Sequence, residues 1–386
     1  MAKRVLFLSN GHGEDLNAVL MIQALRQRDP DLEIWGMPLV GEGGAYRRAG
    51  IAVIVPTRPL PSGGFVYMNY AQLLRDAWAG LLSLLWQQWQ VIRRQGRQCD
   101  LAVAVGDIYP ILLAHLTGQP FAVFLISASS HYEGRTRLPW LTWRLLHSPR
   151  CRQVFSRDAF TASDLQQRGL AKAAWVGNPL LDDLLPQTPL PKPAGIPTFV
   201  LLPGSRLPEA LRNLTLLLQV CAQAGSRFHY WVALVSAMTP EHLQKLHPDW
   251  QYQSNQQPSG QNPSGSLVYQ DVRVECLWGR FADALHHCDG VLGMAGTAVE
   301  QAVGLGKPVL QLAGQGPQFT YRFAEAQMRL LGPSVQTFRR IEDVVARMDT
   351  LFRDPDYLER CRSNGRERLG IPGGSHRLAK ALLALP

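Results

Sequence analysis

Short apolar runs alternate with longer stretches of helical periodicity along most of the chain. Several of these runs have the length and continuity of buried strands, in two sets: residues 4–9, 101–105 and 121–126, then 198–202, 228–235, 290–292 and 308–312. Strands that alternate with helices are typical of parallel sheets covered by helices on both faces. The pattern therefore predicts an α/β protein with two doubly wound sheets.

A proline-rich segment lies between the two sets of strands. Its prolines crowd into one short stretch: Pro179, Pro186, Pro189, Pro191, Pro193 and Pro197. Such a segment has little tendency to form helix or sheet and is typical of an interdomain linker. We expect a first domain over residues 1–178, the linker over 179–197, a second domain over 198–356 and a helical segment over 357–386.

Two segments depart from the alternation. Residues 251–266 have no periodicity and almost no apolar content, which predicts a solvated loop. Residues 71–95 carry a broad apolar face at helical spacing, and 77–92 contain no charge, but this run is shorter than the roughly 20 residues that span a bilayer. Two interpretations stay open, a buried core helix and a surface helix that docks on a membrane. The docking interpretation would use Trp78, Leu82, Trp86, Trp89, Arg93 and Arg94.

Composition narrows the class of protein and its compartment. The 386 residues are 46% hydrophobic and 18% charged, which excludes disorder, and the net charge of +9 favours an anionic partner. The six cysteines form no CxxC pair, so neither a disulfide framework nor a zinc site is indicated. The first apolar run is too short for a secretion signal, and we expect a cytoplasmic protein. The basic residues match no nucleic-acid-binding pattern.

Two candidate sites follow strands of the first set. Residues 9–15 (SNGHGED) form a glycine-rich turn between a strand and a helix, where backbone can approach an anion; a tight turn capped by Asp15 is the structural alternative. Asp107 ends the strand at 101–105, at the sheet edge where ligands bind in α/β proteins. Its carboxylate could take a proton from a hydroxyl or merely cap the next helix. Of the histidines, none of which has metal-ligand spacing, His12 is notable because it lies in the first turn.

Two candidate sites follow strands of the second set. Gly204, Ser205 and Arg206 close the strand at 198–202; glycine permits a sharp turn, and arginine offers a planar fork for phosphate oxygens. A turn of small residues follows 290–292 and opens a helix whose free N–H groups suit a diphosphate. This turn and the polar residues beyond it give the candidates Gly296, Thr297, Ala298, Glu300, Gln301 and Gln315.

These motifs resemble those of the lipid-A-disaccharide synthase family, in the same order and over nearly the whole chain. The matching segments are 13–15 (GED), 176–182 (VGNPLLD), 201–206 (LLPGSR) with Glu209, and 295–298 (AGTA). The LLPGSR and VGNP pair is the specific part, because the GTA turn is shared widely among GT-B enzymes.

The resemblance implies a GT-B fold, in which two Rossmann-like domains face each other across a cleft and the second holds a UDP-sugar. It implies inverting, metal-independent transfer to an acceptor hydroxyl, with no cofactor besides the donor. Asp107 is then the candidate base, with Glu14 and His12 as further catalytic candidates, and Arg206 would hold the diphosphate. The segment 357–386 would return to the first domain.

Two departures from the family pattern affect the ligands. The family's ribose-binding glutamate should lie five residues after the turn glycine, where this chain has Gln301, with Glu300 one position earlier; either could hold the ribose. His12 and residues 126–131 also differ from the family around the acceptor. We therefore expect a lipid or lipid-linked acceptor, with peripheral contact at the inner membrane face, and leave the sugar, the acceptor and the oligomeric state open.

Two other functions compete with sugar transfer. A UDP-N-acetylglucosamine 2-epimerase shares the fold, and residues 300–308 resemble its nucleotide helix; it would need no acceptor. A noncatalytic protein that binds nucleotide sugar or lipid on the same fold is the second, and the glutamine at position 301 is its best support.

Overall fold

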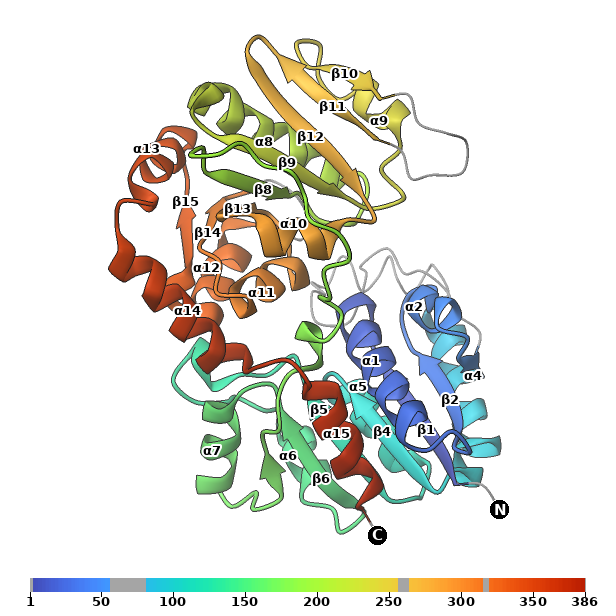
Figure 1. Cartoon of the computed structure of the whole chain (residues 1–386). Coiled ribbons are helices and arrows are strands. Elements are labelled where there is room, and N and C mark those ends of the chain that lie inside the picture. The colour runs from blue at the N-terminus through green and yellow to red at the C-terminus, as the bar shows by residue number, and fades with distance from the viewer. Residues whose placement is uncertain (1–2, 56–80, 256–263, 315–318, 386) are drawn as a thin grey trace. The chain divides into compact units, whose positions relative to one another are not determined.

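The computed structural model describes residues 3–55, 81–255, 264–314 and 319–385 (Figure 1). The chain divides into two compact units. Unit 1 comprises Met1–Asp182 together with Gly370–Pro386, and unit 2 comprises Asp183–Leu369. The first unit is therefore built from both ends of the sequence.

The sheet of unit 1 is parallel throughout its described strands. Its order is β3-β2-β1-β4-β5-β6-β7, so the direction of winding reverses between β1 and β4. The strands are β1 (Arg4–Ser9), β2 (Glu33–Pro38), β3 (Ala52–Val53), β4 (Leu101–Val105), β5 (Phe121–Leu125), β6 (Cys151–Ser156) and β7 (Ala173–Ala174). In α/β folds ligands bind outside the carboxyl ends of the strands at such a reversal.

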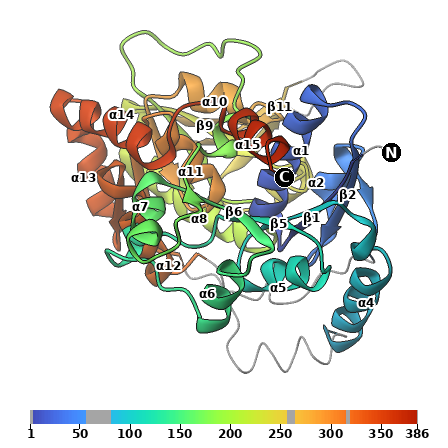
Figure 2. The ribbon, with the colours of Figure 1, turned by 90° about the horizontal axis from the view of Figure 1, so that it is seen from below.

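Helices cover both faces of this sheet. One face carries a hydrophobic cluster with side chains from α1 (His12–Arg28), α2 (Gly44–Arg48) and α15 (Gly374–Leu383). The opposite face carries a second cluster with side chains from α4 (Leu81–Arg94), α5 (Ile108–Leu116), α6 (Trp140–Leu146) and α7 (Ala159–Gln167). Figure 2 shows α4, α5 and α6 in a row on one side of the strands, with α1 and α15 on the other.

The sheet of unit 2 repeats this winding and extends it at one edge. Its order is β10-β11-β12-β9-β8-β13-β14-β15, in which β11 pairs antiparallel with both β10 and β12 and the other pairs are parallel. The strands are β8 (Thr198–Leu202), β9 (His229–Leu234), β10 (Gln251–Ser254), β11 (Ser264–Tyr269), β12 (Val272–Trp278), β13 (Gly290–Gly293), β14 (Val309–Leu312) and β15 (Val335–Phe338). The reversal lies between β8 and β13.

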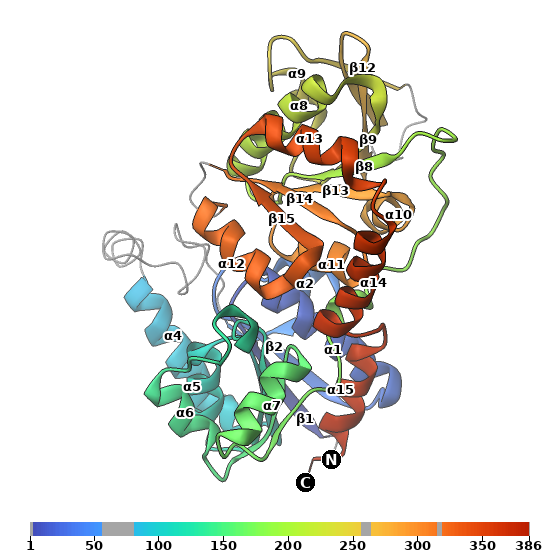
Figure 3. The same ribbon diagram turned by 90° about the vertical axis from the view of Figure 1, so that its left-hand side faces the viewer.

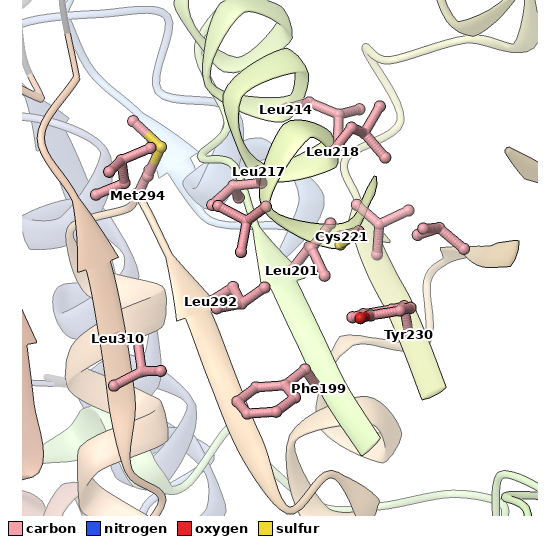
Figure 4. Close-up of a cluster of buried hydrophobic side chains, with 14 of the residues drawn as sticks. Phe199, Leu201, Leu214, Leu217, Leu218, Cys221, Tyr230, Leu292, Met294 and Leu310 are labelled. Atoms are coloured by element: carbon pink, nitrogen blue, oxygen red, sulfur yellow. The ribbon is translucent and has the colours of Figure 1, made fainter. Parts of the chain in front are cut away.

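The core of unit 2 forms where α8 packs on the central strands. Figure 4 shows Phe199 and Leu201 on β8 beside Leu292 on β13, with leucines of α8 above them. Figure 3 shows β13, β14 and β15 side by side, close to α12 and α13. The helices are α8 (Glu209–Ala224), α9 (Pro240–Gln244), α10 (Phe281–His287), α11 (Thr297–Gly304), α12 (Tyr321–Leu331), α13 (Ile341–Leu351) and α14 (Pro355–Leu369).

The fold class expected from the sequence is confirmed, because both units are Rossmann-like doubly wound sheets. The prediction of a loop over residues 251–266 is wrong, since the two ends of this segment form β10 and the start of β11, which pair with each other. Residues 256–263 lie outside the described residues. Polar edge strands lack the apolar signal of buried ones, and here pairing along β12 orders them instead. No described helix has the length and apolarity needed to cross a bilayer.

The C-terminal segment divides between the two units. α14 packs against α11 in unit 2, whereas α15 packs against α1 in unit 1. Asp182 anchors the start of α15, since its carboxylate accepts hydrogen bonds from the backbone N–H groups of Gly373, at 2.5 Å, and Ser375, at 2.7 Å. The VGNPLLD motif at 176–182 therefore has a structural role that its sequence resemblance did not reveal.

Candidate functional site

In unit 1, polar groups gather where β1, β4 and β5 end. Asn10 follows β1 and donates from Nδ2 to Oδ1 of Asp107, which follows β4, at 3.2 Å. Ser127 follows β5 and donates from Oγ to Oε1 of Glu14 at 2.6 Å. A Cβ on Gly106 would lie 2.9 Å from the Glu14 carboxyl, so only glycine leaves room for this carboxyl group. Gly106 also has φ +134°, which favours glycine. The two carboxyl candidates from the sequence thus meet at one sheet edge.

Asp107 is both the cap of α5 and a candidate base. Its Oδ1 accepts the backbone N–H of Tyr109 at 3.2 Å, as an N-cap does. The hydrogen bond from Asn10 also falls on Oδ1, so Oδ2 is the oxygen better placed to meet a substrate hydroxyl. The residue is partly exposed, and desolvation raises the pKa of its carboxyl. A higher pKa makes a carboxylate a stronger proton acceptor.

Asp15 does not cap α1, contrary to one reading of the sequence. The cap position is Gly11, without a side-chain hydrogen bond, and Asp15 lies in the first turn. Its buried carboxylate accepts from Ser9 Oγ at 2.6 Å, and Ser9 also bonds the hydroxyl of Tyr46 at 2.7 Å. Burial raises the pKa of Asp15 to about 7. This buried network supports the turn.

Glu14 titrates far from the usual range of a glutamate. Desolvation raises its pKa to about 8; the hydrogen bond from Ser127 lowers it, and the nearby charges of Asp107 and Asp15 raise it. At neutral pH the carboxyl is therefore mostly protonated and can donate a hydrogen bond. His12 begins α1, but its side chain lies outside the described residues.

The pKa of Glu14 makes the stability of unit 1 pH-dependent. Between the ordinary pKa of 4.5 and about 8, the folded chain holds a proton that the unfolded chain has released, so stability falls as pH rises through this window. Glu14→Gln is expected to flatten that fall, because glutamine does not titrate. Thermal unfolding midpoints from about pH 5 to about pH 9 measure it. A slope identical in wild type and variant would show that Glu14 is not the group responsible.

In unit 2, the turns that follow β8 and β13 lie side by side. Gly204 has φ +101°, which favours glycine, and a Cβ there would lie 3.4 Å from the carbonyl oxygen of Met294. Ser205 is exposed and Arg206 is half-buried. Glu209 is buried, and its carboxylate accepts the backbone N–H of Phe319 at 2.7 Å. Glu209 therefore holds the backbone of Phe319, in a neighbouring loop.

The helix after β13 opens at a glycine. Gly296 is the cap of α11 and offers no side chain, so the first N–H groups of Thr297 and Ala298 have no partner within the helix. Glu300 is partly exposed, whereas Gln301 is buried. Of these two side chains, which the sequence offers as alternatives, only that of Glu300 reaches the surface. Gln315 lies outside the described residues.

Helix α4 combines a core side with an exposed aromatic side. Ile92 is buried in the cluster that also contains side chains of α5 and α6, and Leu84 is buried as well, so the core interpretation holds for this side. Trp86 is 57% exposed and stacks on Trp89 at 4.9 Å between ring centroids. The guanidinium of Arg93 lies 4.7 Å from the Trp89 ring. Arg94 is exposed. Trp78 lies outside the described residues, as does the side chain of Leu82.

Sequence reasoning missed a second exposed aromatic group, on α6. Trp140 is 75% exposed, Leu141 follows it on the surface, and the guanidinium of Arg144 lies 6.0 Å from the Trp140 ring. Because α4 and α6 bury their other sides in the same cluster, their exposed sides face away from the same face of the sheet (Figure 2). Tryptophans flanked by arginines at 135–144 were the signal in the sequence.

Metal ligation has no support among the described residues, where no group of three or more histidine, cysteine, aspartate or glutamate side chains comes together. Two of the histidines instead bond backbone carbonyls, His286 to Leu184 at 2.7 Å and His287 to Asp283 at 2.8 Å.

Comparison with solved structures identifies proteins that share this fold. No protein-family model and no curated protein matches the sequence. Among solved structures, the calicheamicin glycosyltransferase CalG4 aligns with 99% of this chain and 98% of its own, at 18% identity and a TM-score of 0.61. MurG of Acinetobacter baumannii aligns with 99% of this chain and 100% of its own, at 11% identity and a TM-score of 0.54.

A third similar structure is the UDP-GlcNAc 2-epimerase of Neisseria meningitidis bound to UDP-GlcNAc. It aligns with 98% of this chain and 99% of its own, at 15% identity and a TM-score of 0.54. Identities this low show the fold alone. The chain has the GT-B fold, which glycosyltransferases and UDP-GlcNAc 2-epimerases share.

Proposed function

We propose that this protein is a glycosyltransferase that moves a sugar from a UDP-sugar to a hydroxyl of a lipid or lipid-linked acceptor, and that it is related to lipid-A-disaccharide synthases. The observation that carries the proposal is the pair of adjacent turns in unit 2. At the carboxyl ends of β8 and β13, a Cβ on Gly204 would lie 3.4 Å from the carbonyl oxygen of Met294; Arg206 follows in the first turn, and α11 begins at Thr297 in the second. A similar fold, that of the Neisseria 2-epimerase, was solved with UDP-GlcNAc bound.

The donor would bind through its diphosphate. Phosphate oxygens would accept hydrogen bonds from the N–H groups at the start of α11 and from the guanidinium of Arg206. The negative charge on the UDP leaving group grows as the glycosidic bond breaks, and fixed cationic donors stabilise that charge. Glu300 would hold the ribose hydroxyls.

The acceptor hydroxyl would lose its proton to Asp107. Its Oδ2 would take the proton as the hydroxyl oxygen attacks the anomeric carbon, and the protonated Glu14 would donate a hydrogen bond to the acceptor. Attack opposite the leaving group inverts the configuration at that carbon. No metal is required in this scheme, because Arg206 and backbone N–H groups meet the diphosphate charge.

A lipid acceptor is supported by the exposed tryptophans and arginines of unit 1. Residues 81–152 hold eight arginines and no lysine against three carboxylates, so they contribute more than half of the chain's net charge of +9. Tryptophan prefers the headgroup level of a membrane, and arginine is attracted to anionic lipids. We propose a cytoplasmic protein whose α4 and α6 rest on the inner membrane face.

Binding of uridine nucleotides tests the donor assignment. We expect wild type to bind UDP and UDP-sugars in preference to GDP and NADH by titration calorimetry. Arg206→Ala is expected to weaken UDP binding by about tenfold or more, because a hydrogen bond to a charged group contributes about 1.5–3 kcal/mol. Arg212→Ala is the matched control, since Arg212 is an exposed arginine on the following helix α8.

The outcomes separate the fold from the function. Selective UDP binding that is lost in Arg206→Ala but kept in Arg212→Ala supports the donor site. If wild type does not bind uridine nucleotides, or if all three proteins bind them equally, the basis for a transferase is removed. The assignment of the fold does not depend on this result.

Vesicle binding tests the membrane assignment. We expect sedimentation with phosphatidylglycerol vesicles and little with phosphatidylcholine vesicles. Replacing Arg93 and Arg94 by glutamine is expected to weaken binding by about 30-fold, since each arginine near an anionic surface contributes about 1 kcal/mol. The same change at the adjacent pair Arg339 and Arg340 of unit 2 is the control. Equal losses in both double variants would show only a general charge effect.

A UDP-GlcNAc 2-epimerase is the second candidate, because enzymes of that class share this fold over nearly the full chain. The two functions differ in product. An epimerase converts UDP-GlcNAc to its 2-epimer without an acceptor, whereas the proposed transferase releases UDP only when an acceptor is present. Nuclear magnetic resonance spectra of UDP-GlcNAc incubated with the protein alone decide between them.

A further inference from the structure

The buried side chain of Asn213 forms hydrogen bonds to both turns of unit 2. This buried residue of α8 donates from Nδ2 to the carbonyl oxygen of Pro203, in the turn after β8, at 3.0 Å. It also donates to the carbonyl oxygen of Met294, in the turn after β13, at 3.3 Å. The side-chain amide of Asn213 thus donates one hydrogen bond to a backbone carbonyl in each of the two turns.

Gln327 holds the next part of the second turn in the same way. This buried residue of α12 donates from Nε2 to the carbonyl oxygens of Ala295, at 3.2 Å, and Gly296, at 3.0 Å. Its own Oε1 accepts from Nε2 of the buried Gln311 at 2.5 Å, and Gln311 accepts from Thr337 Oγ1 at 3.0 Å. This chain of hydrogen bonds fixes which end of the Gln327 amide points at the turn.

The hydrogen bonds from Asn213 and Gln327 to backbone carbonyls also fix the direction of the N–H groups in the same peptide units. In a trans peptide the C=O and N–H bonds point in opposite directions. The peptide groups held by Asn213 and Gln327 carry the N–H groups of Gly204, Ala295, Gly296 and Thr297. Because their carbonyls turn inward to buried amides, these N–H groups turn away from α8 and α12. Successive N–H groups directed to one side form an anion-binding concavity.

We propose that Asn213 and Gln327 are positioning residues for the diphosphate of the nucleotide, a role that rests on the proposed function. They contact no phosphate themselves. They orient four backbone N–H groups toward the oxygens beside Arg206, so that the binding geometry exists before the ligand arrives. Preorganised donors bind a charge without the cost of reorienting.

The proposal predicts a loss that is specific to phosphate. Asn213→Ala and Gln327→Met are expected to weaken UDP binding by about tenfold or more and to leave uridine binding unchanged, because uridine makes no phosphate contact. Asn364→Ala is the matched control: Asn364 of α14 is a buried amide of the same unit and donates to the carbonyl oxygen of Leu331 at 2.7 Å, away from both turns. Calorimetry with UDP, uridine and pyrophosphate measures the affinities, and thermal unfolding measures the stability of each variant.

Several outcomes are informative. A UDP-specific loss in Asn213→Ala and Gln327→Met, with a similar drop in stability but normal UDP affinity in Asn364→Ala, supports positioning. Normal UDP affinity in Asn213→Ala and Gln327→Met, or equal losses of UDP and uridine in all three variants, overturns it. Wild type that binds pyrophosphate but no uridine compound keeps the anion site and contradicts the transferase proposal. Wild type that binds none of them contradicts both.

Discussion

Asp107→Asn is expected to lower the rate of sugar transfer by about 10²–10⁴-fold, the usual contribution of a positioned general base. Asparagine keeps the cap of α5, because it accepts the Tyr109 N–H as aspartate does. It cannot take up the hydroxyl proton at neutral pH. The fold and the affinity for UDP should therefore survive while turnover is lost.

The assay is transfer of radiolabelled sugar from UDP-sugars to membrane lipid extracts, with UDP affinity measured in parallel. Asp158→Asn is the matched control, since Asp158 caps α7 in the same unit and accepts the Thr161 N–H at 2.7 Å. If Asp107→Asn transfers sugar as fast as Asp158→Asn, the proton goes elsewhere, and Glu14 becomes the next residue to replace. If UDP binds but no lipid in the extract is glycosylated, the noncatalytic alternative gains support.

Leu378→Ala is expected to lower the free energy of unfolding of unit 1 by about 2–5 kcal/mol, as large-to-small changes in a core do. Leu378 lies on α15 and is fully buried in the cluster that also contains side chains of α1. The cavity would loosen the C-terminal helix from unit 1 and leave the core of unit 2 intact. Unit 1 should therefore unfold at a lower denaturant concentration than it does in wild type, while the unfolding of unit 2 stays unchanged.

Tryptophan fluorescence and circular dichroism during urea unfolding measure this effect. Leu185→Ala removes a leucine that is 78% exposed and should change little. A Leu378→Ala protein as stable as the Leu185→Ala protein would show that α15 does not complete the first core.

The sequence allowed accurate prediction where burial is complete. β1, β4 and β8 begin and end at the expected residues, since each is a continuous apolar run that the sheet buries from both faces. β10 was not predicted, because an exposed edge strand needs only backbone pairing and its sequence carries no apolar signal. α15 could not be assigned to its contacts from periodicity, because periodicity gives an apolar face but not the partner that covers it.

The candidate site shows the same division. Asp107 and Arg206 could be placed because each lies in the turn that follows a predictable strand. The meeting of Glu14 with Ser127 joins residues far apart in sequence, and no local pattern encodes it. Gln327 was missed for the same reason, since it lies on α12 and acts on a turn about thirty residues earlier. Side chains that orient other groups depend on tertiary contacts, which a single sequence does not display.

The return of α15 to unit 1 sets an order of events during synthesis. All of Asp183–Leu369 is synthesised before Gly374–Leu383, so unit 2 can begin to fold while the first core still lacks its last helix. Until then the apolar side of α1 that α15 will cover stays open to solvent. Translation that stops near residue 370 would release a chain with one complete unit and one exposed core, which is the kind of product that chaperones and proteases bind.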